Sequence, residues 1–173
     1  LIYGLPEALL HYVFSPRKKG NSTVTYREAV LGDLPRLLEI EQLLVAAERP
    51  FDASIKADKT FYYDITEQIN SHDVHLVVLE HDANIVAVGY AKIRTSKPAH
   101  NHTIHAYLGF MYVSPHLRGQ GVNQHILGLL TQWSRDKGAE ALYLDVYSQN
   151  SSAIRAYEKV GFAPCLVEMK LIL

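Results

Sequence analysis

The sequence predicts a single α/β domain, a mixed and mostly antiparallel sheet that contains one parallel strand–helix–strand unit. Strand-like runs follow one another at residues 75–80, 84–94 and 104–113, the order expected of an antiparallel meander. A helical pattern over 121–137 separates the third run from a further strand at 141–147, and such a unit favours a parallel, right-handed crossover. The 173 residues, 48% of them hydrophobic, suffice for one sizeable core, and no linker-like stretch indicates a second domain.

The residues before the meander predict one strand and two helices. Alternating side chains at 22–28 indicate the strand. The stretch "GDLPRLLEIEQLLVAAERP" has leucines at helical spacing, with Asp33 as its expected N-cap, Pro35 tolerated in the first turn and Pro50 preventing continuation. The leucines give this helix one buried face. A second helix is expected over 59–70.

Turns and later elements complete the predicted order. The tetrapeptide "HDAN" (81–84) is expected to form the hairpin between the first two meander strands. A helix over 150–160 is closed by Gly161, and "CLVEMKLIL" (165–173) predicts a last strand. No internal repeat or low-complexity tract interrupts this order.

Charge, cysteine content and the N-terminal residues limit the class of protein. Because 17 basic and 18 acidic residues nearly cancel, no electrostatic surface for nucleic acid or an anionic membrane is expected. Cys165 is the only cysteine, which excludes an intrachain disulfide and favours a reducing, cytoplasmic location. The run "LIYGLPEALLHYVF" is too short for a membrane span, and its basic cluster follows the apolar residues, the reverse of a secretory signal. Residues 1–21 are therefore interpreted as an N-terminal extension that packs on the 22–173 domain or on a second subunit, which leaves a homodimer open.

The stretch "SPHLRGQGVNQ" (114–124) has the features of an anion-binding loop. A glycine-rich turn at a helix start offers unpaired backbone N–H groups and the positive end of the helix dipole to a phosphate. Gly119 and Gly121 let the backbone come close, and Arg118 adds a fixed charge. The sequence lacks the Gly-Lys-Ser/Thr ending of a Walker loop, and Gln124 stands where the dinucleotide fingerprint has its third glycine. A tight turn with a solvated arginine is the alternative interpretation.

Two longer blocks give this loop its context. "FMYVSPHLRGQGVN" (110–123) resembles the acetyl-CoA loop of the GNAT superfamily of acyl-CoA-dependent N-acetyltransferases, and "LYLDVYSQNSSAIRAYEKVGF" (142–162) is similar to that family's block of strand, Asn, Tyr and Gly-Phe. The resemblance covers about residues 23–173 and implies the GNAT fold, acetyl-CoA as co-substrate and an amine acceptor. Two residues depart from the family pattern. Asn123 stands where Gly or Ala is usual, and Gly109 lies near the position at which many members carry a glutamate base.

The resemblance also implies which residues contact acetyl-CoA. In the family, the strand before the acetyl-CoA loop ends in a characteristic triplet, which corresponds to residues 111–113 here. That strand is bulged in family members, and the bulge frees backbone N–H groups for the thioester oxygen and the pantetheine arm. The glycine loop would hold the pyrophosphate, with the Asn123 amide donating to a phosphate oxygen. Asn150 would cap its helix and would also hydrogen-bond to the pantetheine arm or to the general acid of the reaction. The implied contacts are Met111, Tyr112, Val113, Arg118, Gly119, Gln120, Gly121, Val122, Asn123, Gln124, Asn150 and Tyr157.

Acetyl transfer needs an acid for the departing thiolate and a base for the amine. Tyr157 matches the family's general acid, since a phenol with a pKa of ~10 is protonated at neutral pH, and packing on an apolar helix stripe is the alternative. Asp145 is the first candidate for the base. It lies five residues before Asn150, where the branch of the family that acetylates protein N-termini carries a catalytic glutamate. His105 and Tyr107 are alternatives, as a direct base or as a link in a water chain.

By the same resemblance, residues 47–63 correspond to the region that shapes the acceptor pocket in the family. We expect Phe51, Asp52 and Tyr63, together with Tyr107, to contact the substrate. Their aromatic and charged character suggests a small polar amine, and a peptide N-terminus is the other class considered. The sequence does not identify the acceptor further.

Three histidines near the fourth strand, His100, His102 and His105, invite a metal interpretation. Loop histidines without a matching carboxylate or cysteine pattern are usually solvated, so no metal is expected.

The predicted function is transfer of an acetyl group from acetyl-CoA directly to a primary amine. Cys165 has no histidine near it in the sequence, so no covalent intermediate is expected. A non-catalytic acyl-CoA-binding regulatory module of the same fold is the alternative, because Gly109 removes the usual base. The presence of Asp145 and Tyr157 argues against that alternative.

Overall fold

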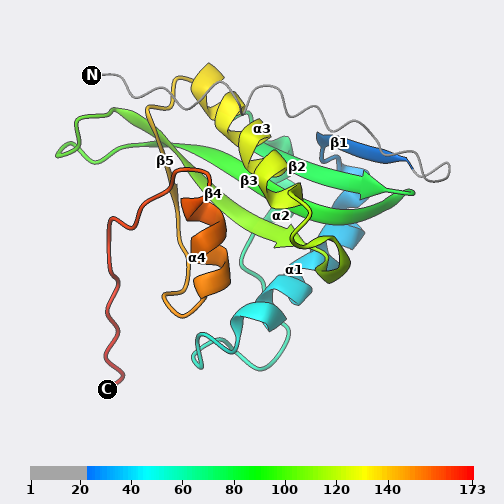
Figure 1. Cartoon of the computed structure of the whole chain (residues 1–173), viewed down its shortest axis with the longest axis horizontal. Coiled ribbons are helices and arrows are strands. Elements are labelled where there is room, and N and C mark those ends of the chain that lie inside the picture. The colour runs from blue at the N-terminus through cyan, green and yellow to red at the C-terminus, as the bar shows by residue number, and fades with distance from the viewer. Residues whose placement is uncertain (1–22) are drawn as a thin grey trace.

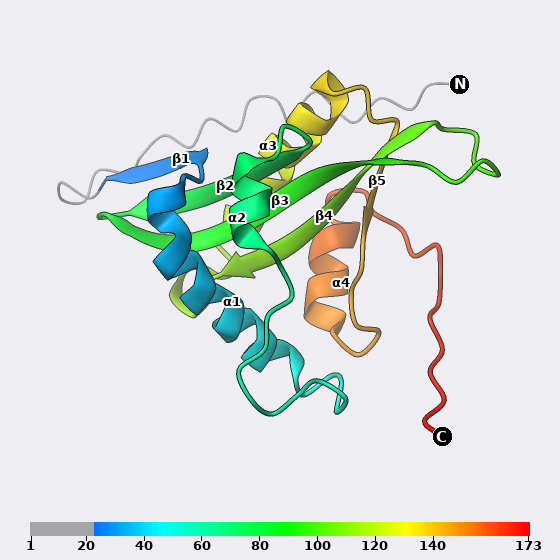
Figure 2. The same ribbon diagram turned by 180° about the vertical axis from the view of Figure 1, so that it is seen from behind.

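The computed structural model describes residues 23–173, so the prediction for the N-terminal extension, residues 1–21, lies outside the described residues. The described chain forms a mixed sheet between two layers of helices (Figures 1 and 2). Its strands are β1 (Val24–Glu28), β2 (Val74–His81), β3 (Asn84–Thr95), β4 (Ile104–Val113) and β5 (Ala141–Leu144). They lie side by side in chain order, with β1 to β4 antiparallel and β5 parallel to β4, which confirms the predicted fold class.

Helices cover both faces of this sheet. They are η2 (Leu31–Asp33), α1 (Leu34–Glu48), α2 (Ile65–Asn70), η3 (Pro115–Leu117), α3 (Val122–Asp136) and α4 (Ser151–Glu158). Helices α1 and α2 lie on one face, and α3 and α4 lie on the other (Figure 2). A hydrophobic core lies on each face of the sheet. Because side chains alternate along a strand, β2 contributes to both cores, with Leu76 packed on the α1 side and Val77 on the α3 side. None of the described helices is long and apolar enough to cross a bilayer.

The hairpin between β2 and β3 forms where the sequence predicts it. Its two loop residues, Asp82 and Ala83, have φ angles of 50° and 60°, the left-handed conformation that a two-residue turn of this kind needs. The Thr23 N–H donates to Asp82 Oδ1 (3.0 Å), and the Asp82 N–H donates to the Thr23 carbonyl (3.0 Å). These two bonds tie the turn to the start of β1.

Helix α2 is shorter than predicted. The helix expected over 59–70 begins only after Asp64, whose carboxylate caps it by accepting a first-turn N–H. The residues before it stay in a loop, because Oε1 of the buried Glu41 accepts the N–H groups of Tyr62 (2.6 Å) and Tyr63 (2.9 Å). A carboxylate of α1 thus takes backbone donors that a longer helix would use.

Asp33 stands at the N-cap position of α1, as predicted, but its side chain accepts no N–H of that helix. Its carboxylate accepts the Val30 N–H (2.8 Å) and forms an ion pair with Arg27 of β1 (2.7 Å). The bond from the Arg27 guanidinium lowers the pKa of Asp33. A charge-assisted bond to a neighbouring strand has therefore replaced the weaker cap.

Two strand predictions near the C-terminus are wrong. The strand expected over 141–147 ends at Leu144, and residues 165–173 join no strand of the sheet. They follow α4 as an extended segment that runs away from the sheet (Figure 1). Alternation in a sequence describes one segment alone, whereas a strand forms only where a second backbone pairs with it. Within the described chain no backbone pairs with residues 165–173.

Candidate active site

A β-bulge interrupts β4 at the predicted acetyl-CoA triplet. The register between β3 and β4 shifts, so that Phe110 and Met111 of β4 stand opposite Gly89 of β3. Phe110 has a φ of 53°, a strained conformation for a bulky residue. Gly89 fits here because a Cβ at its position would lie 2.7 Å from the Met111 sulfur. The bulged strand expected from the family resemblance is therefore present.

Tyr63 supports the bulge from the α1 side of the sheet. Its hydroxyl accepts the Phe110 N–H (3.1 Å), a donor that the bulge displaces from the strand ladder. Its ring lies 5.0 Å from the ring of Phe110 and 5.6 Å from that of Tyr90, between centroids. Burial raises the pKa of the Tyr63 hydroxyl, which therefore keeps its proton. A residue predicted to contact the acceptor thus also holds the strand that carries the triplet.

Tyr90 occupies the space beside Gly109. A Cβ on Gly109 would lie 2.5 Å from the Tyr90 hydroxyl oxygen, so the tyrosine fills the volume that a glutamate at 109 would need. Burial raises the pKa of Tyr90, and the charges of Arg94 and Asp145 act on it in opposite directions. The sequence analysis missed Tyr90, because only the β3–β4 register pairs it with Gly109.

Strands β4 and β5 separate beyond the pair formed by Leu108 and Leu144. This is the last pair of the parallel ladder, and β4 continues to Val113 after β5 has ended. In the described chain, residues 109–113 thus have no strand partner on that edge. A cleft of 3020 Å³ runs from the glycine loop past β5 to α4, and Gly121 and Leu144 both line it.

The glycine loop forms an open start to α3. Gly119 and Gly121 have φ angles of 75° and 81°, which residues with a Cβ adopt only under strain. No heavy atom lies within 4 Å of a Cβ built on either glycine, so the space before the loop is open. No side chain caps α3, which leaves its first backbone N–H groups for a ligand. Arg118 donates through Nε to the Val113 carbonyl (3.0 Å), and this bond holds its guanidinium beside the end of β4.

The other side chains of the loop divide into core and surface. Val122, the first residue of α3, is buried in the core between this helix and the sheet, so its side chain is not available to a ligand. Gln120 donates to the His116 carbonyl (2.8 Å), which fixes its amide within the loop. Asn123 is half-buried and Gln124 is exposed, both on the first turn of α3.

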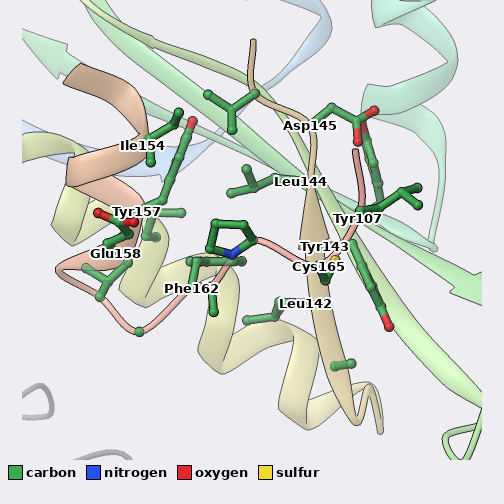
Figure 3. Close-up of a pocket in the computed structure, with 18 of the residues that line it drawn as sticks. Tyr107, Leu142, Tyr143, Leu144, Asp145, Ile154, Tyr157, Glu158, Phe162 and Cys165 are labelled. Carbon is green, nitrogen blue, oxygen red and sulfur yellow. The ribbon is translucent and has the colours of Figure 1, made fainter. Parts of the chain in front are cut away.

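Tyr157 projects from α4 into the same cleft (Figure 3). Asn150 caps α4 by accepting the Ala153 N–H (3.2 Å), which confirms its predicted capping role. The Tyr157 ring packs against Phe162 with centroids 5.9 Å apart, so the predicted packing role is also present. Burial, and to a smaller extent the charge of Glu48, raises the pKa of Tyr157 to about 12. The phenol is therefore protonated throughout the physiological pH range.

Asp145 and Tyr107 lie across β5 from Tyr157 (Figure 3). The Tyr107 hydroxyl donates to Asp145 Oδ2 (2.6 Å), and the Arg94 guanidinium lies 3.8 Å above the Tyr107 ring. Burial, followed by the bond to Asp145, raises the pKa of Tyr107, which makes it a donor rather than a base. The structure thus joins the first candidate base to one of its alternatives and separates both from the candidate acid by one strand.

Glu48, at the end of α1, is a carboxylate that the sequence analysis missed. It is half-buried and hydrogen-bonded to the Tyr62 side chain, and burial raises its pKa. Tyr147 hydrogen-bonds to Tyr62 and stacks on Phe51 at 6.0 Å between centroids. Three segments far apart in the sequence meet here, and no spacing in the sequence indicates the contact.

Asp52 lines the cleft, and its carboxylate already forms an ion pair with Lys170 of the same chain. Its Oδ1 accepts from Lys170 Nζ (2.6 Å) and from the Ser54 hydroxyl (2.7 Å). These bonds, with Lys170 the largest cause, lower the pKa of Asp52 to about 2. Its predicted contact with a substrate amine would therefore compete with Lys170.

Two of the three histidines form a hydrogen-bonded cluster. The Ser96 hydroxyl lies 2.7 Å from His102 Nδ1 and 2.9 Å from His105 Nδ1, and His102 Nε2 lies 2.9 Å from the Tyr143 hydroxyl. Burial lowers the pKa of His105 and so favours its neutral ring. Over residues 23–173, no group of three His, Cys, Asp or Glu side chains is arranged to hold a metal ion.

Curated relatives of this chain include two named acetyltransferases. A streptothricin acetyltransferase of Streptomyces lavendulae is 36% identical over 59 residues, 34% of this chain and 31% of that protein. An aminoglycoside N(6')-acetyltransferase type 1 of Stenotrophomonas maltophilia is 32% identical over 78 residues, 43% of this chain and 51% of that protein. The matched region thus spans less than two thirds of each of these relatives.

Solved structures share the fold at low sequence identity. A mutant form of the BH1408 protein of Bacillus halodurans superposes with a TM-score of 0.77 at 18% identity, over 86% of this chain and 99% of that one. A predicted acetyltransferase of Clostridium acetobutylicum, solved with acetyl-CoA, gives a TM-score of 0.70 at 18% identity, over 87% and 96% of the two chains.

A family model decides the relationship. The model described as the acetyltransferase (GNAT) family matches residues 37–162, well over half of the chain. The match extends from α1 through the bulged β4 and the glycine loop to the end of the α4 block. The chain therefore belongs to the GNAT family of acetyltransferases.

Proposed function

We propose that the chain transfers an acetyl group from acetyl-CoA to a primary amine of a small molecule or peptide, by direct attack of the amine. One observation carries this proposal. The backbone of β4 is bulged at Phe110 and Met111, and beyond Leu108 it has no strand partner on its β5 side within the described chain, while the cleft that begins at Gly121 passes along β5 to α4. The free edge of β4 supplies backbone donors for an acyl oxygen, and the start of α3, which follows it in the chain, supplies backbone donors for a phosphate.

The residues of the glycine loop suit a diphosphate. The uncapped start of α3 offers N–H groups and the positive helix end, and the open space before Gly119 and Gly121 admits phosphate oxygens. Arg118, beside Val113, retains guanidinium N–H groups beyond the one that bonds to the strand. Acetyl-CoA supplies the thioester, and its pantetheine arm is proposed to follow the edge of residues 109–113 that has no strand partner in the described chain.

The side chains around β5 supply the proton transfers. Asp145 accepts a proton from the amine, directly or through one water, and Tyr107 keeps this carboxylate oriented. As the new C–N bond forms and the C–S bond breaks, Tyr157 donates its phenolic proton to the departing sulfur. A backbone N–H of β4 other than that of Phe110, which Tyr63 accepts, stabilises the developing oxyanion, an effect of about 3 kcal/mol for a well-placed donor.

The position of the acid and the base on opposite sides of β5 supports direct transfer. Tyr157 faces the cleft on the α4 side, where the sulfur would lie, and Asp145 faces the side from which the amine would approach. The two sides communicate where β5 has ended at Leu144. An amine that reaches this gap meets the acyl carbon without a carrier residue between them.

A smaller pocket of 360 Å³ on the Asp145 side suits a polar acceptor. Tyr62, Tyr90 and Arg94 contribute to its lining. Gln68, only 7% exposed, also lines it, and its Oε1 has no hydrogen-bond partner within residues 23–173. A buried carbonyl oxygen of this kind favours a ligand with an N–H or O–H donor. A small amine with several polar groups suits this lining, and two relatives, which are named as acetyltransferases of streptothricin and of aminoglycosides, support testing acceptors of this kind.

Thiol release from acetyl-CoA tests the proposal. A panel of polyamines, aminoglycosides, amino acids and short peptides is assayed at fixed acetyl-CoA, with acetyl-CoA affinity measured by calorimetry. We expect thiol release with at least one amine. Binding of acetyl-CoA without release on any amine would favour the regulatory-module alternative, for which the filled space beside Gly109 is the structural argument.

A further inference from the structure

Residues 163–173, here called the C-terminal segment, carry a dense run of exposed apolar side chains. The segment is extended, and no backbone–backbone hydrogen bond joins it to the rest of residues 23–173 (Figure 1). Six of its apolar side chains are between 80% and 111% exposed: Leu166, Val167, Met169, Leu171, Ile172 and Leu173. A contiguous apolar run with an unpaired backbone is a site for pairing with another strand.

The order of residues in this segment is complementary to itself. We propose that residues 165–173 pair antiparallel with the same residues of a second copy of the chain, about a twofold axis at Met169. In this register Glu168 stands opposite the partner's Lys170, and Lys170 stands opposite the partner's Glu168. Every other cross-strand pair joins two apolar side chains, because all remaining residues of 165–173 are apolar.

Other registers lose this complementarity. A shift of one residue places Glu168 and Lys170 opposite apolar side chains. A shift of two residues places either Glu168 opposite Glu168 or Lys170 opposite Lys170, and parallel pairing in register does both. Like charges directly opposite one another destabilise a strand pair. The charges therefore select the antiparallel register centred on Met169.

The proposed strand pairing also affects the loop that carries Asp52, which lies beside the cleft. Lys170 already bonds to Asp52 (2.6 Å), and both residues line the cleft. In the dimer, Lys170 lies between Asp52 of its own chain and the partner's Glu168. A second copy thus fixes one wall of the cleft, and this inference does not depend on the reaction that the cleft supports.

Charge reversal tests the register. The unmodified chain, Glu168→Lys, Lys170→Glu and the double variant are compared by analytical ultracentrifugation over a range of concentrations. We expect a dimer of the unmodified chain, a dissociation constant raised roughly tenfold or more in each single variant, and restoration to within about threefold in the double variant. These side chains are exposed, so circular dichroism and the unfolding midpoint serve as the check that each variant folds. A monomer at every concentration, or a dimer that both single variants leave intact, would overturn the proposal.

Disulfide trapping provides an independent test of the axis. In a Cys165→Ser background, Met169→Cys places two thiols at directly opposite positions, where Cα atoms lie about 4.5–5.5 Å apart and a disulfide can form. Val167→Cys is the matched control on the same strand face. Its symmetry mate lies four residues away along the strand, roughly 13 Å, too far for a disulfide. We expect covalent dimers from Met169→Cys alone, and equal trapping of both variants would contradict the register.

Discussion

Tyr63→Phe removes a single oxygen atom from the support of the β4 bulge. The ring contacts of Tyr63 with Phe110 (5.0 Å) and Tyr90 (5.6 Å) remain, so the variant isolates the hydrogen bond from the Phe110 N–H (3.1 Å). A part-buried N–H left without an acceptor costs about 1–2 kcal/mol of unfolding free energy. For a domain of this size we expect a fall in Tm of roughly 3–6 °C.

The same variant tests whether the bulge serves catalysis. If its backbone donors stabilise the oxyanion, a relaxed bulge lowers kcat by about tenfold while KM for acetyl-CoA changes less. Urea unfolding and initial rates measure the two effects. Tyr62→Phe is the control for stability, since its side chain bonds to Glu48 rather than to β4, and we expect a change within about 0.5 kcal/mol. A Tyr63→Phe protein with unchanged unfolding free energy and turnover would refute the role assigned to this hydroxyl.

Three further predictions concern the cofactor loop, the acid and the cleft wall. Arg118→Ala should weaken acetyl-CoA binding by about tenfold and more than Asn123→Gly does, because it removes a charge-assisted contact, and calorimetry that gives equal affinities for Arg118→Ala and the unmodified chain contradicts the phosphate assignment. Tyr157→Phe should lower the single-turnover rate by about 100-fold with little change in acetyl-CoA affinity, whereas a native rate across roughly pH 6 to 9 would leave Tyr157 only its packing role. Because Lys170 lowers the pKa of Asp52 to about 2, the ion pair is fully formed above the ordinary carboxyl pKa and is lost as the pH falls through about 2. NMR titration of Asp52 should show this low pKa and its return toward the ordinary value in Lys170→Ala, and an unchanged Asp52 titration in that variant would contradict the pairing.

The sequence predicted the parts of this fold that depend on local patterns. The meander, the hairpin at Asp82 and Ala83, the crossover to a parallel strand and the cap at Asn150 are all present. Each follows from alternation, from turn chemistry or from a capping side chain, and these act within a few residues. The glycine conformations at the start of α3 belong to the same group, since Gly119 and Gly121 adopt positive φ.

Boundaries and partners depended on contacts between distant residues. Helix α2 is short because Glu41 of α1 accepts the N–H groups of Tyr62 and Tyr63. The last predicted strand is absent because residues 165–173 pair with no backbone of the described chain, although the outer edge of β5 is free. A backbone donor or a strand edge is satisfied by whichever partner the fold brings nearest, and a local pattern does not encode that partner.

The candidate site shows the same division. The sequence by itself indicated the glycine loop through its turn chemistry, and it indicated Tyr157 and Asp145 through their resemblance to the motifs of the GNAT family. Only the tertiary structure decided that Asp145 is bound by Tyr107 and that β5 separates this pair from Tyr157. It also decided that Tyr90 fills the space beside Gly109. The physical reason is that strand register and the termination of β5 set these distances, and both result from packing across the whole sheet.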